Sequence, residues 1–395
     1  MRALPFALLT IALAGCQTYD FEPVSPLAIA QTTQTKSVAA KNKKPDLMML
    51  IDTSGSMAAP LNPADPNCRV GGNVCQSPGC PANCPTRISD LKRSMGTFLM
   101  GNPSVARVGM TVFPVDALCG SSNKIIVELS QSNDVDTELA KTSDDVNKAI
   151  QNLAVQGGTP TGDSLRFLAN YSPLANPDRE DFVLLLTDGL PNCNQAQVGV
   201  ANTCACTDSR SPCSYTPPSS STTYSLCLDK DGSVAAVGDL RKKNIKTIVV
   251  GFGADTAVGA GPDTLNAMAE AGGFARACPM QTDAECGSNN TCDKASKLCV
   301  RKFYQASNAA ELAKALQDII DIVKGVDLCT YTLDAVPDDP AFLAVIYNGQ
   351  SLAQSDSTWK YAAGKVTFQG QYCDQIKTAT QDNKVQLEFR IVNTL

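Results

Sequence analysis

The stretch LMMLIDTSGS, from Leu47 to Ser56, decides the fold that the sequence predicts. Its first half is a run of five apolar residues, which is typical of a strand buried on both faces of a parallel sheet. Its second half carries one carboxylate, Asp52, and two hydroxyls, Ser54 and Ser56. Because open α/β sheets bind ligands at the carboxyl ends of their strands, we expect these side chains to form part of a binding site.

Two later segments carry matching chemistry. The loop GGTPTG contains Thr159, and Asp188 belongs to the segment TDG that directly follows the apolar run FVLLL. Carboxylates and hydroxyls are hard oxygen donors, which suit Mg²⁺, Mn²⁺ or Ca²⁺ better than a soft metal. Each segment taken singly is also typical of an ordinary turn. Together, and in this order, they favour one metal site formed by Asp52, Ser54, Ser56, Thr159 and Asp188.

This set resembles the metal-ion-dependent adhesion site of von Willebrand factor type A domains, and the resemblance covers residues 45–325. It implies a doubly wound, mostly parallel α/β sheet of Rossmann-like class with disulfide-rich insertions. It also implies that Ser54, Ser56 and Thr159 contact the metal directly, whereas Asp52 and Asp188 act mainly through water. With only two carboxylates nearby, such a metal stays electrophilic and accepts an acidic group of a partner. Mg²⁺ is the favoured cation, with Mn²⁺ and Ca²⁺ as alternatives.

The composition of the chain excludes several classes of function. The chain of 395 residues is long enough for two domains, and 43% hydrophobic with 18% charged residues is typical of globular proteins. A formal net charge of -6 argues against nucleic acid as a partner. Histidine is absent, which excludes Ser-His-Asp and Cys-His catalysis and His-ligated zinc. Because no general-base constellation stands out either, we expect a binding protein and not an enzyme.

The N-terminus indicates export and anchoring. Residues 1–15 combine Arg2 with an apolar core that is too short to cross a bilayer, which is typical of a signal peptide. The sequence LAGC that ends at Cys16 resembles the lipobox of bacterial lipoproteins, which implies an acylated Cys16 and a membrane anchor. By the same resemblance, Gln17 implies sorting to the outer membrane. A plain secretory signal is the alternative. Residues 16–44 lack periodicity and are predicted to form a flexible tether.

The remaining cysteines indicate disulfides. Of 17 cysteines, Cys16 is set aside for lipid, and the sixteen that remain are an even number in an exported chain. They fall in three predicted insertions, 58–85, 190–231 and 278–300, in a predicted hairpin and in the C-terminal domain. The disulfide candidates are Cys68, Cys75, Cys80 and Cys84; Cys119; Cys193, Cys204, Cys206, Cys213 and Cys227; Cys278, Cys286, Cys292 and Cys299; Cys329 and Cys373.

The number of cysteines in each insertion suggests which of them form disulfides with one another. The four cysteines of the first insertion can satisfy one another, as can the four of the third, whereas the second insertion holds five. We expect Cys119, in a hairpin between strands at 108–113 and 125–129, to pair with one of those five. We also expect the first and second insertions to wall the metal site, either for recognition or merely as protection from proteolysis. Cys329 and Cys373 should close a small β-sandwich-like domain over residues 326–395.

These predictions converge on an outer-membrane lipoprotein adhesin that binds an acidic group of a protein or surface through its metal site. The architecture resembles that of lipoprotein adhesins of gliding motility, which implies envelope proteins of a motility machine as partners. The alternative is an envelope scaffold whose metal is structural.

Overall fold

The computed structural model describes residues 33–38, 44–131, 134–176, 179–194, 196, 203–207, 211–216, 221–324, 329–333, 335–337, 339–377 and 385–394. The predicted signal peptide, the predicted lipidation site Cys16 and most of the predicted tether lie outside these residues. Within the described part of the chain, no helix is both long and apolar enough to cross a membrane.

The larger domain alternates strands with helices. Its strands are β2 (Asp46–Asp52), β5 (Arg107–Phe113), β6 (Asp181–Thr187), β9 (Ile245–Phe252) and β12 (Tyr304–Ala306). Its helices are α2 (Arg87–Gly101), α3 (Asp136–Gln151), α4 (Thr161–Ala169), α5 (Lys230–Lys242), α6 (Gly261–Ala271) and α7 (Ala309–Lys324), with 3-10 turns η1 (Gly55–Ala58), η3 (Ser172–Leu174) and η5 (Ala254–Thr256). All neighbouring strands pair in parallel, in the order β12-β9-β6-β2-β5, so the predicted doubly wound α/β class is confirmed.

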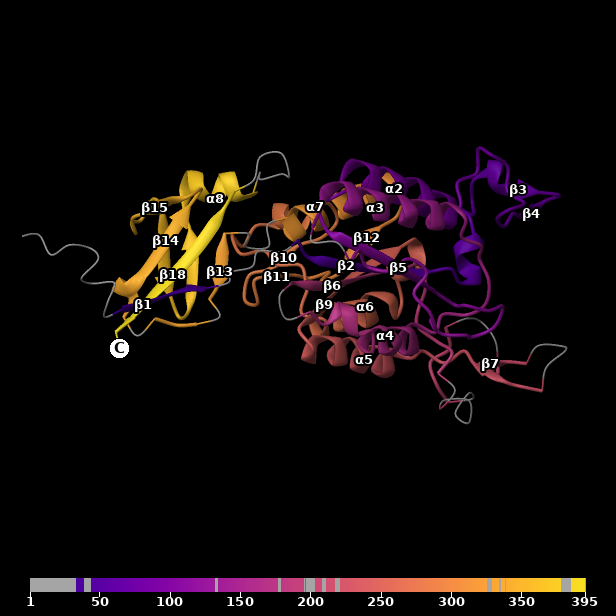
Figure 1. Cartoon of the computed structure of the whole chain (residues 1–395). Helices are drawn as coiled ribbons and strands as arrows, with labels where there is room; N and C mark the ends of the chain where they lie inside the picture. Colours follow the sequence, from indigo (N-terminus) through magenta and orange to yellow (C-terminus); the bar gives the residue numbers. More distant parts are fainter. Residues whose placement is uncertain are drawn as a thin grey trace, which may run out of the picture.

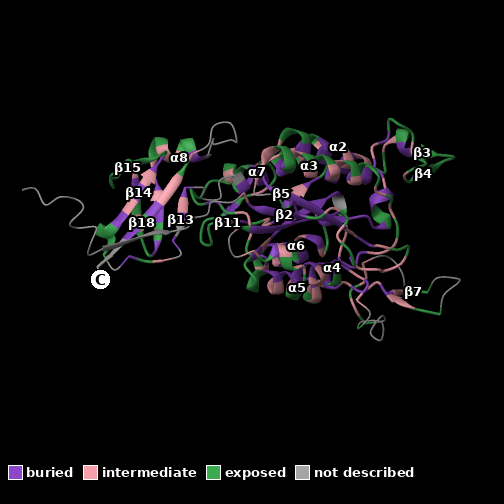
Figure 2. Cartoon of the chain, viewed as in Figure 1, coloured by how far each residue is buried: buried purple, intermediate pink, exposed green. Residues whose placement is uncertain are grey.

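The apolar run of β2 separates two helical layers. Leu47, Met49 and Ile51 belong to the core under α2, α3 and α7, whereas Met48 and Leu50 belong to the core over α4, α5 and α6. Figure 1 shows these two layers on opposite faces of the sheet, and Figure 2 shows the strands buried between exposed helix surfaces. Because successive side chains of a strand point to opposite faces, only a continuous apolar run can serve both cores.

The strand order creates a crevice beside β2. The chain runs from β2 to β5 on one side and then returns to place β6 on the other side of β2. At such a reversal the connections leave the sheet in opposite directions, and a crevice opens at the carboxyl ends of the strands. Asp52 ends β2 and Asp188 directly follows β6, so both carboxylates lie at this crevice.

One predicted strand is wrong. The segment 125–129 forms a single bridge, between Met110 and Val127, and not a strand of the sheet. Gly109 allows this approach, because a side chain there would lie 3.1 Å from the Val127 carbonyl oxygen. Beyond the bridge, the hydroxyl of Thr111 donates to the carbonyl of Lys124 at 2.7 Å, so a side-chain bond takes the place of a ladder bond.

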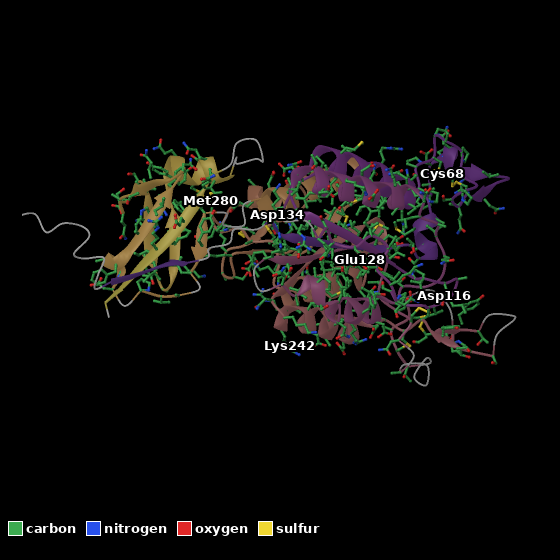
Figure 3. All side chains as sticks on the ribbon, viewed as in Figure 1. Cys68, Asp116, Glu128, Asp134, Lys242 and Met280 are labelled. Atoms are coloured by element: carbon green, nitrogen blue, oxygen red, sulfur yellow. A yellow bond between two sulfur atoms is a disulfide. The ribbon has the colours of Figure 1, made fainter. Side chains whose placement is uncertain are left out.

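The insertions form small disulfide-clamped units. The first holds η2 (Pro66–Cys68), β3 (Arg69–Val70) and β4 (Asn73–Val74); the second holds β7 (Ser214–Tyr215) and β8 (Tyr224–Ser225); the third holds η6 (Asp283–Cys286), β10 (Cys292–Asp293) and β11 (Leu298–Cys299). Figure 1 shows β3, β4 and β7 at the end of the domain that is remote from the C-terminal domain. In Figure 3, Cys68 and Asp116 mark this end, and Asp134 lies toward the other.

All sixteen predicted cysteines are paired. The pairs are Cys68–Cys84, Cys75–Cys80, Cys119–Cys193, Cys204–Cys227, Cys206–Cys213, Cys278–Cys292, Cys286–Cys299 and Cys329–Cys373. The first and third insertions are therefore each closed on themselves. The bond between Cys119 and Cys193 agrees with the prediction that Cys119 pairs with the second insertion.

The C-terminal domain consists of two small sheets. One pairs β1 (Thr33–Val38), β18 (Leu387–Thr394), β14 (Leu343–Tyr347) and β15 (Gln350–Leu352), and the other pairs β13 (Thr330–Thr332), β17 (Lys365–Phe368) and β16 (Trp359–Ala362). The 3-10 turn η7 (Pro340–Phe342) and helix α8 (Gly370–Lys377) complete it. Trp359, Phe368 and Phe389 are buried in the core between the sheets.

Strand β1 corrects the predicted tether. Residues 33–38 pair antiparallel with β18, from Thr33 opposite Thr394 to Val38 opposite Phe389. The tether prediction rested on the absence of hydrophobic periodicity, but the edge of β18 offers backbone donors and acceptors that a polar segment rich in threonine can satisfy. A segment that belongs to the N-terminus by sequence therefore completes the C-terminal domain.

Candidate metal centre

Asp52 lies fully buried at the end of β2, and both of its carboxylate oxygens accept hydrogen bonds. Its Oδ1 accepts the backbone N–H of Ser54 at 2.8 Å, and its Oδ2 accepts the hydroxyl of Thr187 at 2.7 Å. Thr187 is the last residue of β6, so the carboxylate joins the ends of the two central strands. This fixes the orientation of Asp52 before any ligand arrives.

The two serines turn toward Asp188. The hydroxyls of Ser54 and Ser56 lie 2.9 Å apart, and Ser56 donates to Asp188 Oδ1 at 2.9 Å. Asp188 is fully buried, whereas Ser56 is exposed at the surface of the loop. The hydroxyl oxygens therefore lie between a buried carboxylate and solvent.

Thr159 reaches the same place from a third loop. A side-chain carbon added at Gly189 would lie 3.6 Å from Ser56 Oγ and 3.8 Å from Thr159 Oγ1, so both hydroxyls border the space above Gly189. The backbone ties the loops together, since the N–H of Gly55 donates to the carbonyl of Gly157 at 3.0 Å. All five predicted residues thus gather at one end of the sheet.

Asn192 clamps the backbone of Thr159. The N–H of Thr159 donates to Asn192 Oδ1 at 2.9 Å, and the N–H of Asn192 donates to the carbonyl of Thr159 at 2.9 Å. The adjacent disulfide packs against Gly158, where an added side-chain carbon would lie 2.5 Å from Cys193 Sγ. The second insertion therefore fixes the Thr159 loop both by hydrogen bonds and by contact.

Arg87 is the buried cation of the site. Its Nη1 donates to Asp188 Oδ2 at 2.7 Å and its Nη2 donates to Asp255 Oδ2 at 2.7 Å. The Arg87 side chain is 7% exposed, whereas that of Asp255 is 62% exposed. Burial by itself would lower the pKa of Arg87, but its two carboxylate partners outweigh burial and raise it. The guanidinium therefore stays charged.

Arg87 alone cannot compensate all the carboxylates of the site when they are ionised. Burial, and after it the charge of Asp188, raises the pKa of Asp52 to about 7. Burial also raises the pKa of Asp188, against the opposing charge of Arg87. A buried carboxylate without a full counter-charge is costly in a low-dielectric site. The site thus has a deficit of positive charge beside an array of hydroxyl oxygens, which fits a hard divalent cation.

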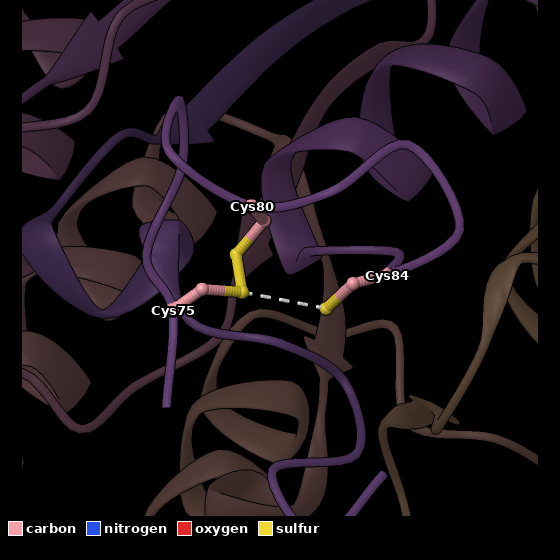
Figure 4. A group of neighbouring side chains, drawn as sticks. All are labelled: Cys75, Cys80 and Cys84. Carbon is pink, nitrogen blue, oxygen red and sulfur yellow. Dashed lines mark hydrogen bonds between the residues drawn. A yellow bond between two sulfur atoms is a disulfide. The ribbon is translucent and has the colours of Figure 1, made fainter. Parts of the chain in front are cut away.

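The cysteine clusters do not offer a metal site. Three groups, Cys75/Cys80/Cys84, Cys204/Cys213/Cys227 and Cys278/Cys286/Cys299, bring sulfur atoms within 4.8 Å of one another. In the first group, Cys75 Sγ and Cys84 Sγ lie 3.6 Å apart, and Cys75 is bonded to Cys80 (Figure 4). Every sulfur in these groups belongs to a disulfide, and metals bind thiolates.

The carboxyl-end crevice opens into a cleft of about 490 Å³. Ser54, Ser56 and Thr159 of the predicted metal site line it. Among the described residues that line it, the others are Gly189 and residues of the 117–119 loop, the Gly157–Gly158 loop, the second insertion and the turn at Asp255. None comes from the first insertion, so of the two insertions expected to wall the site, only the second does.

Sequence reasoning missed three residues that shape this site: Thr187, Arg87 and Asn192. The sequence offered a clue to the role of Arg87, because a cation in the first turn of a helix is unfavourable unless a nearby carboxylate compensates it. Thr187 precedes the predicted metal residue Asp188 but looks like an ordinary strand residue. Asn192 carried no signal, because its partner Thr159 is 33 residues away.

Comparison with known proteins gave matches at the level of structure. No model of a known protein family and no curated protein matches the sequence. Solved structures that match include the pilus adhesin SpaC from Lactobacillus rhamnosus GG, with 14% identity, a TM-score of 0.40, and coverage of 92% of this chain and 43% of that one. The chain thus spans less than half the length of SpaC.

Two further solved structures match a smaller part of this chain than SpaC does. The manganese-loaded TRAP protein from Plasmodium vivax shows 15% identity, a TM-score of 0.35, and coverage of 73% of this chain and 78% of that one. The vWF domain of the type V pili tip protein Mfa5 from Porphyromonas gingivalis shows 12% identity, a TM-score of 0.36, and coverage of 71% and 95%.

Proposed function

We propose that this chain is a surface adhesin that binds an acidic group of a partner through a divalent cation held by Asp52, Ser54, Ser56, Thr159 and Asp188. The observation that carries the proposal is the gathering of these oxygen-bearing side chains from three loops: the hydroxyls of Ser54, Ser56 and Thr159 line a cleft, and the carboxylates of Asp52 and Asp188 are buried behind them. Mg²⁺ is the proposed cation, with Mn²⁺ or Ca²⁺ as alternatives.

The residues would have different roles in holding a cation. Ser56 donates its proton to Asp188 and so accepts the proton of Ser54, which leaves one lone pair of its oxygen available to a cation. Asp52 supplies buried negative charge, and its two hydrogen bonds prevent it from turning into the cleft. A bound cation of this type supplies an open coordination position for a carboxylate from outside. Because hydroxyls donate little charge, that position stays attractive to an acid.

The anchoring part of the proposal rests on sequence. Acylation of Cys16 would attach the chain to the outer membrane, and the resemblance to gliding-motility adhesins names envelope proteins of a motility machine as further partners. In Figure 1, the C-terminal domain that includes β1 lies at one end of the molecule, and the first and second insertions lie at the other. A tether that emerges beside β1 would therefore present the metal face away from the membrane.

Adhesion with and without metal tests this function. Cells that display equal, verified amounts of wild-type or variant chain would be assayed for attachment in Mg²⁺, in Mn²⁺ and after chelation. We expect Asp52→Ala and the isosteric Asp52→Asn to abolish metal-dependent attachment. Asp263→Asn, which removes an exposed carboxylate on α6, is the matched control and should attach like the wild type.

The result separates the proposal from its alternative. Attachment that persists after chelation and in a folded Asp52→Asn variant would overturn the adhesin proposal. If chelation lowers the melting temperature of such a protein without affecting attachment, the metal serves folding, and the chain is an envelope scaffold.

A further inference from the structure

The cleft is lined by more residues than Ser54, Ser56 and Thr159 of the metal site. Part of its wall belongs to the second insertion, where the hairpin of β7 and β8 contributes two tyrosines. Tyr215 and Tyr224 are directly paired across the two strands, so their side chains project from the same face of the hairpin. Tyr215 is 39% exposed and Tyr224 is half-buried. Two aromatic rings thus border the same cleft as the serines of the metal site.

The hairpin is held in place from both sides. Cys206 is bonded to Cys213, directly before β7, and Cys204 is bonded to Cys227, shortly after β8. Beyond the hairpin, Asn192 donates to the hydroxyl of Thr207 at 2.9 Å, and Thr207 donates to the carbonyl of Leu226 at 2.9 Å. Because these links lead back to Thr159 through Asn192, the tyrosines keep a set position relative to the metal loop.

One part of the cleft wall is apolar. Leu118, Leu190 and Leu226 line it, and each is only half-buried. Its polar side chains are already engaged, since Asn192 and Thr207 bond to each other. A sugar needs many donors and acceptors from its site, whereas an apolar side chain needs contact area of this kind. The lining therefore favours a peptide over a glycan.

We propose that this cleft is a peptide subsite that takes an apolar or aromatic side chain lying close in sequence to the acidic residue bound at the metal. The partner is thus a protein segment with an acidic residue beside an apolar one. Tyr215 and Tyr224 determine the specificity, and the carboxylate supplies the shared anchor. This inference rests on the proposed metal-dependent function.

Peptide selection tests the subsite directly. A phage-displayed library of random linear peptides would be selected on the purified full chain in Mg²⁺. The best peptide and its analogue with the apolar residue replaced by serine would then be measured by calorimetry against wild type, Tyr215→Ser and Tyr224→Ser. We expect the tyrosine variants to bind the selected peptide about tenfold more weakly than the wild type does, which is the scale of a lost aromatic contact. The variants and the wild type should bind the serine analogue with equal affinity.

Two control variants isolate the rings. Tyr215→Phe and Tyr224→Phe keep the ring and should retain the affinity for the selected peptide. Val70→Ser removes an exposed apolar side chain from the first insertion, where it is 53% exposed, and should change nothing. Unchanged melting temperature and Mn²⁺ affinity of each variant would show that the fold and the metal residues are intact.

The outcomes distinguish the two proposals. Selected peptides that share an acidic residue without an apolar neighbour, or tyrosine variants that weaken both peptides equally, would overturn the subsite and leave the metal function standing. Selected peptides that bind equally well after chelation would overturn the proposed function itself. Tyrosine-dependent binding of glycans in an array, without selection of any peptide, would also overturn the peptide subsite.

Discussion

Arg87 Nη1 lies 2.7 Å from Asp188 Oδ2, and both side chains are buried. The arginine begins α2 and the aspartate follows β6, so one ion pair connects the first helix of the domain with the proposed metal site. Asp188 also accepts the hydroxyl of Ser56. Arg87 and a divalent cation would therefore compensate the same carboxylate, and their contributions to stability should be coupled.

Replacing Arg87 by methionine should reveal that coupling. Arg87→Met leaves Asp188 buried without its counter-charge, which typically costs about 3–5 kcal/mol of unfolding free energy. We expect this loss in chelator and a larger stabilisation by Mg²⁺ than the wild type shows, measured by urea denaturation. Lys141→Met removes an exposed lysine of α3 whose partner Asp145 is also exposed, and it should leave the unfolding free energy nearly unchanged. Equal stabilisation of Arg87→Met and wild type by Mg²⁺ would refute the coupling.

Asn192→Ala should loosen the Thr159 loop. The variant loses the bond from the Thr159 N–H to Asn192 Oδ1 and the bond from Asn192 Nδ2 to the hydroxyl of Thr207, but it keeps the fold of the sheet. Groups that orient metal ligands typically contribute about 10–100-fold to affinity, so we expect a loss of Mn²⁺ affinity in that range by calorimetry. Asn152→Ala, which removes an exposed amide after α3, serves as the control. An unchanged Mn²⁺ affinity of Asn192→Ala would mean that Asn192 does not position Thr159 for the metal.

Removal of the Cys119–Cys193 bond should affect both stability and binding. The double variant Cys119→Ser/Cys193→Ser opens a loop of 74 residues, and loss of a native disulfide typically costs about 2–5 kcal/mol. Because this disulfide contacts Gly158, we also expect weaker Mn²⁺ binding. Cys278→Ser/Cys292→Ser opens the third insertion and should leave Mn²⁺ affinity intact. If both double variants bind Mn²⁺ like the wild type, the disulfide has no role at the site.

The buried carboxyl of Asp181, at the amino end of the sheet, should make the free energy of unfolding depend on pH. Burial, and after it the charge of Asp46, raises the pKa of Asp181 to about 8 from 3.8. Because the folded state holds this proton more tightly than the unfolded state, the stability it contributes is complete below pH 4 and is lost as the pH rises through about 8.

Asp181→Asn mimics the protonated acid and cannot ionise. Relative to the wild type, it should gain about 1 kcal/mol or more between pH 5 and about pH 9, measured by urea denaturation in chelator. Asp263→Asn, on the exposed surface of α6, should follow the wild-type profile. Parallel profiles of Asp181→Asn and wild type would show that Asp181 is ionised throughout.

Sequence periodicity predicted most of the large domain, because a strand buried on both faces needs an unbroken apolar run and a surface helix needs an apolar stripe. It failed at 125–129, where the bridge to Met110 depends on the close approach that Gly109 allows. It also failed at β1, whose pairing with β18 relies on backbone groups that leave no pattern in the side chains.

The sequence by itself determined the fold class, the disulfide partition among the insertions, and the grouping of Asp52, Ser54, Ser56, Thr159 and Asp188 as one candidate site. It could do so because apolar runs, cysteine parity and strand-end positions are properties of the chain order. Only the tertiary structure decided that Arg87 pairs with Asp188, that Asn192 clamps Thr159 and that Tyr215 and Tyr224 border the cleft. These contacts join residues far apart in sequence, and their partners are selected by the packing of strands and disulfides in space.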